Sequence, residues 1–114
     1  MSTGNVAAIA RVKNAAPLFA ALGDETRLQL IGRLSATGPL SITQLTGKAR
    51  VSRQAITKHL EVLGEVGLVK SSRRGRERIW ELEPKRLDDA RAYLDRVSKE
   101  WDDALGRLQA FVED

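Results

Sequence analysis

Residues 51–82 read VSRQAITKHLEVLGEVGLVKSSRRGRERIWEL, and this stretch decides the fold. Ser52 is a favourable N-cap, and Val51 and Ile56 stand at the two positions of a hydrophobic staple, so a helix is expected to begin here. Gly67 is typical of a helix C-terminus. The apolar residues between these two ends recur at helical spacing on one side, which leaves a polar face exposed.

An extended segment begins at residues 68–70, and a second extended run covers residues 78–82. Between them, residues 72–76 form a turn in which Gly75 permits the positive φ of a tight hairpin. Arginines occupy most of that turn and the start of the second strand. A helix with an exposed polar face and an arginine-tipped hairpin suit DNA, because one can enter a groove and the other can follow phosphates.

Four further helices are expected from periodicity and caps. Pro17 is expected to kink or restart the first of them. Ser41 and Gln44 fit a capping box that opens the third, and this short helix, a tight turn and the helix from Ser52 make a helix-turn-helix unit. The sequence predicts one domain over residues 1–114, mainly α with a small β-hairpin. The four helices are placed at residues 6–22, 25–35, 42–48 and 85–113.

The last helix carries a seam of apolar residues that alternate at spacings of three and four. Such a seam favours a partner helix, which could be the N-terminal helix of the same chain, the matching helix of a second chain, or both. Trp101 and Tyr93 could instead line an effector pocket, although a tryptophan at heptad spacing is more often an interface anchor. The seam consists of Leu87, Ala90, Leu94, Val97, Trp101, Ala104, Leu108 and Phe111.

Charge is unevenly distributed along the 114 residues, whose formal net charge is +4. Residues 48–78 hold nine Lys/Arg and three Asp/Glu, whereas residues 79–114 hold six and ten. A basic middle beside an acidic C-terminal third indicates one face for nucleic acid and another region for a different contact. The chain has no cysteine, so disulfides and thiolate metal sites are excluded. Without a signal-peptide pattern or a long apolar run, we expect a cytoplasmic protein with no membrane contact.

Three separated segments carry a family resemblance. LFAALGDETRL at residues 18–28 resembles the opening signature of ArsR-type (arsenic-repressor-type) transcriptional regulators, and residues 52–63 are similar to their recognition helix. Residues 67–69 with residues 74–76 are similar to their wing. The resemblance implies a winged helix-turn-helix in which residues 41–82 bind DNA. It also implies a homodimeric repressor whose first and last helices form the dimer interface.

The sequence departs from the metal-sensing members of that family. Where those members carry a cysteine pair, this chain has residues 40–45, LSITQL, and its one histidine, His59, lies in the expected recognition helix. Transition-metal sites in such sensors rely on cysteine or histidine. We therefore expect a branch that does not sense metals, with no metal and no cofactor, and the sequence does not identify an effector.

The candidate DNA contacts fall into three groups. Recognition-helix candidates can read base edges or hold phosphates, although His59 could equally be a boundary histidine with no DNA contact. Arginines of the wing can reach phosphates or a minor groove. Hydroxyls before the recognition helix could meet a phosphate or serve only as caps. The recognition-helix group is Ser52, Arg53, Gln54, Thr57, Lys58 and His59. The wing group is Arg73, Arg74, Gly75, Arg76 and Arg78, and the preceding hydroxyls are those of Ser41 and Thr43.

The dimer interface is expected to combine both terminal helices, through Val6, Ile9, Val12, Phe19, Leu94, Val97, Trp101 and Leu108. Trp80 in the second strand is expected in the core. An enzyme is not expected, because the sequence offers no catalytic constellation. The expected function is a sequence-specific repressor that occludes a promoter, such as that of its own operon, through an inverted-repeat operator. The alternative is a winged-helix protein-interaction module with weak or non-specific DNA binding.

Overall fold

The computed structural model describes residues 3–47 and 50–113. It is mostly helical, with one three-stranded antiparallel sheet. This architecture confirms the predicted mainly α fold with a β-hairpin. The elements are α1 (Thr3–Leu22), α2 (Glu25–Thr37), β1 (Leu40–Ser41), α3 (Ile42–Thr46), α4 (Arg53–Glu65), β2 (Val69–Arg74), β3 (Glu77–Leu82) and α5 (Pro84–Glu113).

Side chains at the caps set the beginnings of the two helix-turn-helix helices. The Ser41 hydroxyl accepts a hydrogen bond from the Gln44 backbone N–H at 3.1 Å, and the Gln44 side chain accepts one from the Ser41 N–H at 2.9 Å. This is the predicted capping box. At α4, the Ser52 hydroxyl accepts from the Ala55 N–H at 3.1 Å. Both cap predictions are confirmed.

Helix α4 ends in a Schellman motif. Gly67 has a φ of +80°, and its N–H donates to the carbonyl of Gly64. The next N–H, from Leu68, donates to the carbonyl of Leu63, and both leucines are fully buried. A residue with a side chain is disfavoured at this φ, so Gly67 allows the chain to leave the helix and enter β2 at once.

The sheet has the order β1-β3-β2, and the short β1 was not predicted. Leu40 pairs with Trp80 and Ser41 with Ile79. In the hairpin, Arg74 is opposite Glu77, so Gly75 and Arg76 form a two-residue loop. Gly75 has a φ of +63° and Arg76 a negative one, the pattern of a type II′ turn.

The first helix does not restart at Pro17. Helix α1 is assigned continuously from Thr3 to Leu22, although proline removes one backbone donor. The turn after the proline is held by tertiary packing, because Leu18 and Ala21 are both buried in the core. Helix packing therefore overrides the local penalty at this position.

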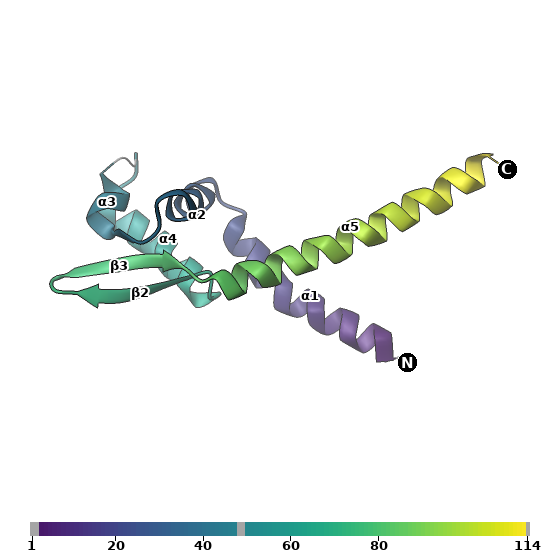
Figure 1. The fold of residues 1–114 in the computed structure, drawn as a ribbon, viewed down its shortest axis with the longest axis horizontal. Coiled ribbons are helices and arrows are strands. Elements are labelled where there is room, and N and C mark those ends of the chain that lie inside the picture. The colour runs from purple at the N-terminus through teal and green to yellow at the C-terminus, as the bar shows by residue number, and fades with distance from the viewer. Residues whose placement is uncertain (1–2, 48–49, 114) are drawn as a thin grey trace.

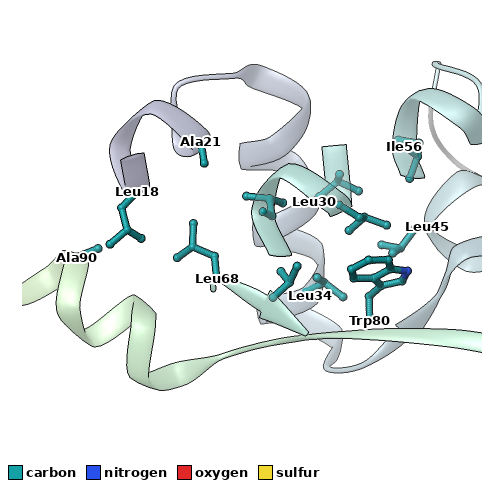
Figure 2. Packing of buried hydrophobic residues seen from close by; sticks show 12 residues of the cluster. Leu18, Ala21, Leu30, Leu34, Leu45, Ile56, Leu68, Trp80 and Ala90 are labelled. Atoms are coloured by element: carbon teal, nitrogen blue, oxygen red, sulfur yellow. The ribbon is translucent and has the colours of Figure 1, made fainter. Parts of the chain in front are cut away.

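One hydrophobic core joins all five helices to the sheet (Figure 2). Trp80 is 5% exposed and lies in this core, as predicted. Leu68 lies between the α1–α5 end of the core and its α2–α4 end (Figure 2). Buried leucine and isoleucine side chains from α2, α3 and α4 fill the remaining space, and their burial fixes how α4 sits on the domain.

The molecule is elongated, with extents of 65 × 31 × 21 Å. Helices α3 and α4 and the hairpin gather at one end, whereas α1 and α5 cross and extend from the other (Figure 1). Every residue from 98 to 113 is exposed.

Within residues 3–47 and 50–113, no single helix is long and apolar enough to cross a membrane. Helices α1 and α2 reach that length together but bend by 91° at their junction.

Candidate nucleic-acid interface

Helix α4 has one face in the core and one in solvent. Ile56, Leu60 and Leu63 are buried, while Gln54 and Lys58 are exposed. The polar side chains meet in a shallow hollow on the outer face, lined by Arg53, Gln54, Thr57, Lys58 and Glu61. Four of the recognition-helix candidates, Arg53, Gln54, Thr57 and Lys58, are thus brought together, whereas Ser52 and His59 do not line this hollow. An exposed helical face of this kind fits a DNA major groove.

Two hydroxyls of this helix are already used within it. Ser52 is exposed but caps the helix, and Thr57 donates from its hydroxyl to the carbonyl of Arg53 at 2.9 Å. Gln54 and Lys58, in contrast, make no side-chain hydrogen bond or ion pair within the described residues, so their polar groups stay candidates for base edges.

The wing places its arginines on two different faces. Arg73 is the cross-strand partner of Arg78, and these two share an open hollow with Arg76, Ser71 and Ser72. Arg74 is opposite Glu77 and is not among the residues lining that hollow. The predicted wing is therefore confirmed as a hairpin, with three of its arginines concentrated on one side.

The concentration of charge on this side is uncompensated. In the described part of the chain, ion pairs involve His59, Lys70 and Arg86, and none involves a wing arginine. The guanidinium carbon of Arg78 lies 5.7 Å from the Trp80 ring centroid. A cation–π contact of this kind orients the arginine without neutralising it. Such a cluster attracts a phosphate backbone.

His59 faces inward. Its Nδ1 lies 3.2 Å from a guanidinium nitrogen of Arg27 and 3.8 Å from Asp24 Oδ1. Arg27 also donates to the carbonyls of Ala20 and Ala21, which end α1. The structure thus places His59 among the residues that hold the α1–α2 junction, apart from the outer face of α4.

The two candidates before the recognition helix differ. Ser41 is 3% exposed and its hydroxyl serves the capping box, so the structure favours its capping role over a phosphate contact. Thr43 is exposed near the beginning of α3 and stays a candidate. The predicted turn residue Ala49 and the predicted helix end at Lys48 lie outside the described residues.

Arg33 positions the helix-turn-helix, a role that sequence reasoning missed. From α2, its guanidinium donates to the carbonyl of Leu45 at 2.7 Å and to that of Gln44 at 2.9 Å. These are carbonyls of the five-residue helix α3, which is too short to be stable alone. No local pattern marks Arg33 for this role, because its acceptors lie eleven and twelve residues away.

Electrostatics at the α2 N-terminus are favourable for a carboxylate. The Arg27 backbone N–H donates to Asp24 Oδ1 at 3.0 Å, and this bond, with the nearby Arg27 and His59 charges, holds the pKa of Asp24 below its usual 3.8.

Within the described ranges, no group of three or more His, Asp or Glu side chains is arranged to hold a metal ion.

The predicted interface residues lie on exposed apolar faces of α1 and α5. Val6, Ile9 and Val12 are about half exposed, and so is Leu94, while Trp101 is 67% exposed. Phe19 differs, since it packs against the core and its ring centroid lies 5.6 Å from that of Tyr93. Val97 and Leu108 complete the α5 stripe, the first half-buried and the second exposed.

Comparisons with known proteins give a consistent picture. A helix-turn-helix domain family matches residues 22–72. The chain is 40% identical over 85 residues to the HTH-type transcriptional regulator Rv2034 of Mycobacterium tuberculosis, covering 75% of this chain and 76% of the relative. It is 41% identical over 68 residues to the uncharacterized HTH-type transcriptional regulator YuzN of Bacillus subtilis, covering 54% and 74%. An ArsR-like transcriptional regulator from Rhodococcus has a similar structure, with a TM-score of 0.74 and 36% identity over 87% of this chain and 92% of that one.

Proposed function

Because the chain belongs to the ArsR-type family of winged helix-turn-helix transcriptional regulators, which bind DNA and are not enzymes, we propose that it is a homodimeric, sequence-specific repressor. Two recognition helices related by a twofold axis enter successive major grooves roughly 34 Å apart, so the operator is an inverted repeat. The bound dimer occludes a promoter, and its own operon is one target. It acts in the cytoplasm.

One observation carries the DNA-reading part of the proposal. The outer face of α4 presents Gln54 and Lys58 in a single hollow, next to a wing whose arginines form no ion pair in the described part of the chain. The helix supplies side chains suited to base edges, and the wing supplies charge for phosphates. A protein-interaction module has no need of the positive charge on the wing.

The proposed dimer is supported by surface that the domain leaves uncovered. Helix α5 has 30 residues, which at 1.5 Å per residue span roughly 45 Å, well beyond the core. Its outer half exposes Trp101, Leu105, Leu108 and Phe111. A contiguous apolar stripe of this size promotes aggregation unless another chain covers it. A second copy presents the same stripe and can cover it symmetrically.

The proposed branch of the family does not sense metals. Transition-metal sensing requires thiolate or imidazole ligands, yet the chain has no cysteine and its single histidine is engaged with Arg27 and Asp24. The signal that relieves repression is then a different one.

Salt-dependent binding tests the function. Affinity for the promoter-derived site and for random DNA is measured by fluorescence anisotropy between 50 and 200 mM salt, with sites identified by genomic footprinting. We expect Arg76→Ala to weaken binding to both DNAs and to lower the salt slope by about one unit. Gln54→Ala or Lys58→Ala is expected to cost about 1–3 kcal/mol on the specific site, with a smaller effect on random DNA.

Arg91→Ala is the matched control for Arg76→Ala, since Arg91 is exposed on α5, far from the wing along the chain. It should leave both affinities unchanged. A DNA affinity of the parent chain that does not change with salt would instead support the protein-interaction module. Scattered, non-palindromic footprints would contradict the twofold model.

A further inference from the structure

A groove of about 350 Å³ lies between α1 and α5, on the side of α5 next to the apolar seam. On α5 its lining residues Arg86, Asp89, Tyr93 and Arg96 are spaced by three, four and three, so they form one stripe of the helix. The seam residues Leu87, Ala90 and Leu94 form the neighbouring stripe. None of the residues that line the groove belongs to the surface proposed for the dimer, although the Tyr93 ring contacts Phe19 of that surface, and the groove volume suits a small molecule.

The groove is strongly basic for its size. Three arginines line it, Arg11, Arg86 and Arg96, against the single carboxylate of Asp89. Asp89 is already engaged, because Arg86 donates to it at 3.3 Å. Within the described residues, neither Arg11 nor Arg96 takes part in a side-chain hydrogen bond or an ion pair. Two guanidinium groups are thus free to donate to a ligand.

Apart from Asn14, the rest of the lining is apolar or aromatic. Ala15 and Leu18 are buried at its floor, and the half-buried Tyr93 contributes its ring and hydroxyl. Guanidinium groups match the planar, two-oxygen geometry of a carboxylate. From this combination we infer that the groove is a binding site for a small organic carboxylate, with the carboxylate on Arg11 and Arg96 and an apolar or aromatic body on Leu18 and Tyr93.

Arg86 connects this groove to the recognition helix. Its Nε donates to the carbonyl of Val66, the C-cap of α4, at 2.9 Å, and its other nitrogens donate to Asp89 and to the carbonyl of Asn14 on α1. Its side chain also packs within 4 Å of the position that a Cβ on Gly67 would occupy. Arg86 lines the same groove, so a carboxylate held on Arg11 and Arg96 also competes with the Val66 carbonyl for the Arg86 donors and loosens the hold of Arg86 on α4. Bound ligand therefore lowers DNA affinity, a coupling that rests on the proposed function.

The binding site is tested with benzoate as the probe, against chloride and inorganic phosphate at equal ionic strength. Binding is followed by NMR chemical-shift titration of the arginine side chains of the full chain. We expect saturable shifts of Arg11, Arg86 and Arg96 with benzoate. Arg11→Gln and Arg96→Gln should each raise the benzoate Kd at least tenfold. Both residues are exposed, and circular dichroism checks that the variants fold.

Arg91→Gln is the control, because it removes the same charge from an exposed position of α5 outside the groove. It should change the benzoate Kd less than twofold. Three outcomes would overturn the site: an equal loss of benzoate affinity in Arg91→Gln, unchanged benzoate affinity in both groove variants, or chemical shifts that respond to phosphate but not to benzoate. DNA affinity is measured separately: saturating benzoate should lower it at least threefold in the parent chain and not in Arg96→Gln. Unchanged DNA affinity with bound benzoate overturns the coupling, whereas absence of DNA binding without benzoate contradicts only the proposed function.

Discussion

His59 joins the recognition helix to the beginning of α2 through Arg27 and Asp24. Its side chain is 23% exposed, so removing it breaks a partly buried hydrogen bond. We expect His59→Ala to lower the free energy of unfolding by about 1 kcal/mol and to leave DNA affinity within about twofold. Urea denaturation and anisotropy measure the two effects. Unchanged stability with lost DNA affinity would place His59 at a phosphate instead.

Asp24 makes the same junction sensitive to acid. Its pKa is held below 3.8 in the folded chain, chiefly by the Arg27 backbone N–H, so the folded state favours the charged carboxylate. Its contribution to stability is therefore present above pH 3.8 and is lost as the pH falls below 3.8 through the folded pKa. Asp24→Asn should flatten the fall in stability over that range, as urea denaturation from pH 5 to pH 3 would measure. Asp95→Asn, on the exposed side of α5, should not flatten it.

The wing is an element built for binding at some cost to its own stability. Arg73 and Arg78 are direct cross-strand partners, and like charges in that arrangement repel. We expect Arg73→Gln to raise the free energy of unfolding by about 0.3 kcal/mol, or to leave it unchanged, while it weakens DNA binding and lowers the salt slope by about one unit. Urea denaturation and salt titration give the two values.

Arg91→Gln removes the same charge from α5 and should affect neither quantity. A large loss of stability in Arg73→Gln, with DNA binding unchanged, would mean that Arg73 supports the hairpin and does not contact DNA.

The elements that sequence could predict are those specified by nearby residues. The caps at Ser41 and Ser52 act three residues away, and the buried and exposed faces of α4 follow from its own spacing. Gly75 marks the hairpin turn, and Trp80 belongs to the core by its type and position. The wing and the outer face of the recognition helix were therefore predictable together.

The elements that sequence missed depend on distant partners. The two-residue β1 exists because Leu40 meets Trp80 on β3, forty residues later. The sequence left the role of His59 open, because its inward placement depends on Arg27, which is 32 residues away; Arg86 reaches the Asn14 carbonyl across 72 residues. Helix α1 continues through Pro17 because the residues after it are buried. Tertiary packing, which no local pattern contains, decides each of these features.

At the scale of the whole molecule, the proposed dimer depends on the outer half of α5. Trp101 is 67% exposed, so Trp101→Asp removes little that the single chain needs. We expect this variant to keep its helical content but to lose the dimer and operator binding, because a single half-site binds too weakly at physiological salt. Sedimentation equilibrium and circular dichroism measure the two properties, and deletion of residues 98–114 should abolish the dimer as well.

Lys99→Asp is the matched control. Lys99 is exposed and lies two residues before Trp101, which places it toward the opposite side of the helix. Lys99→Asp introduces the same carboxylate as Trp101→Asp and should leave the dimer intact. A soluble, DNA-competent dimer of Trp101→Asp would show that the interface lies elsewhere.

The exposure of every residue from 98 to 113 has a consequence for the life of the protein in a cell. In the proposed dimer, those side chains become buried only when two copies associate. Mass action then makes the thermal stability of the fold depend on protein concentration. We expect the midpoint of thermal unfolding to rise with protein concentration. At low copy number, we expect solitary chains to expose the α5 end to proteases and to be removed first. If the protein is the dimeric repressor proposed above, we expect it to be cleared quickly once its synthesis stops and to persist only above a threshold abundance.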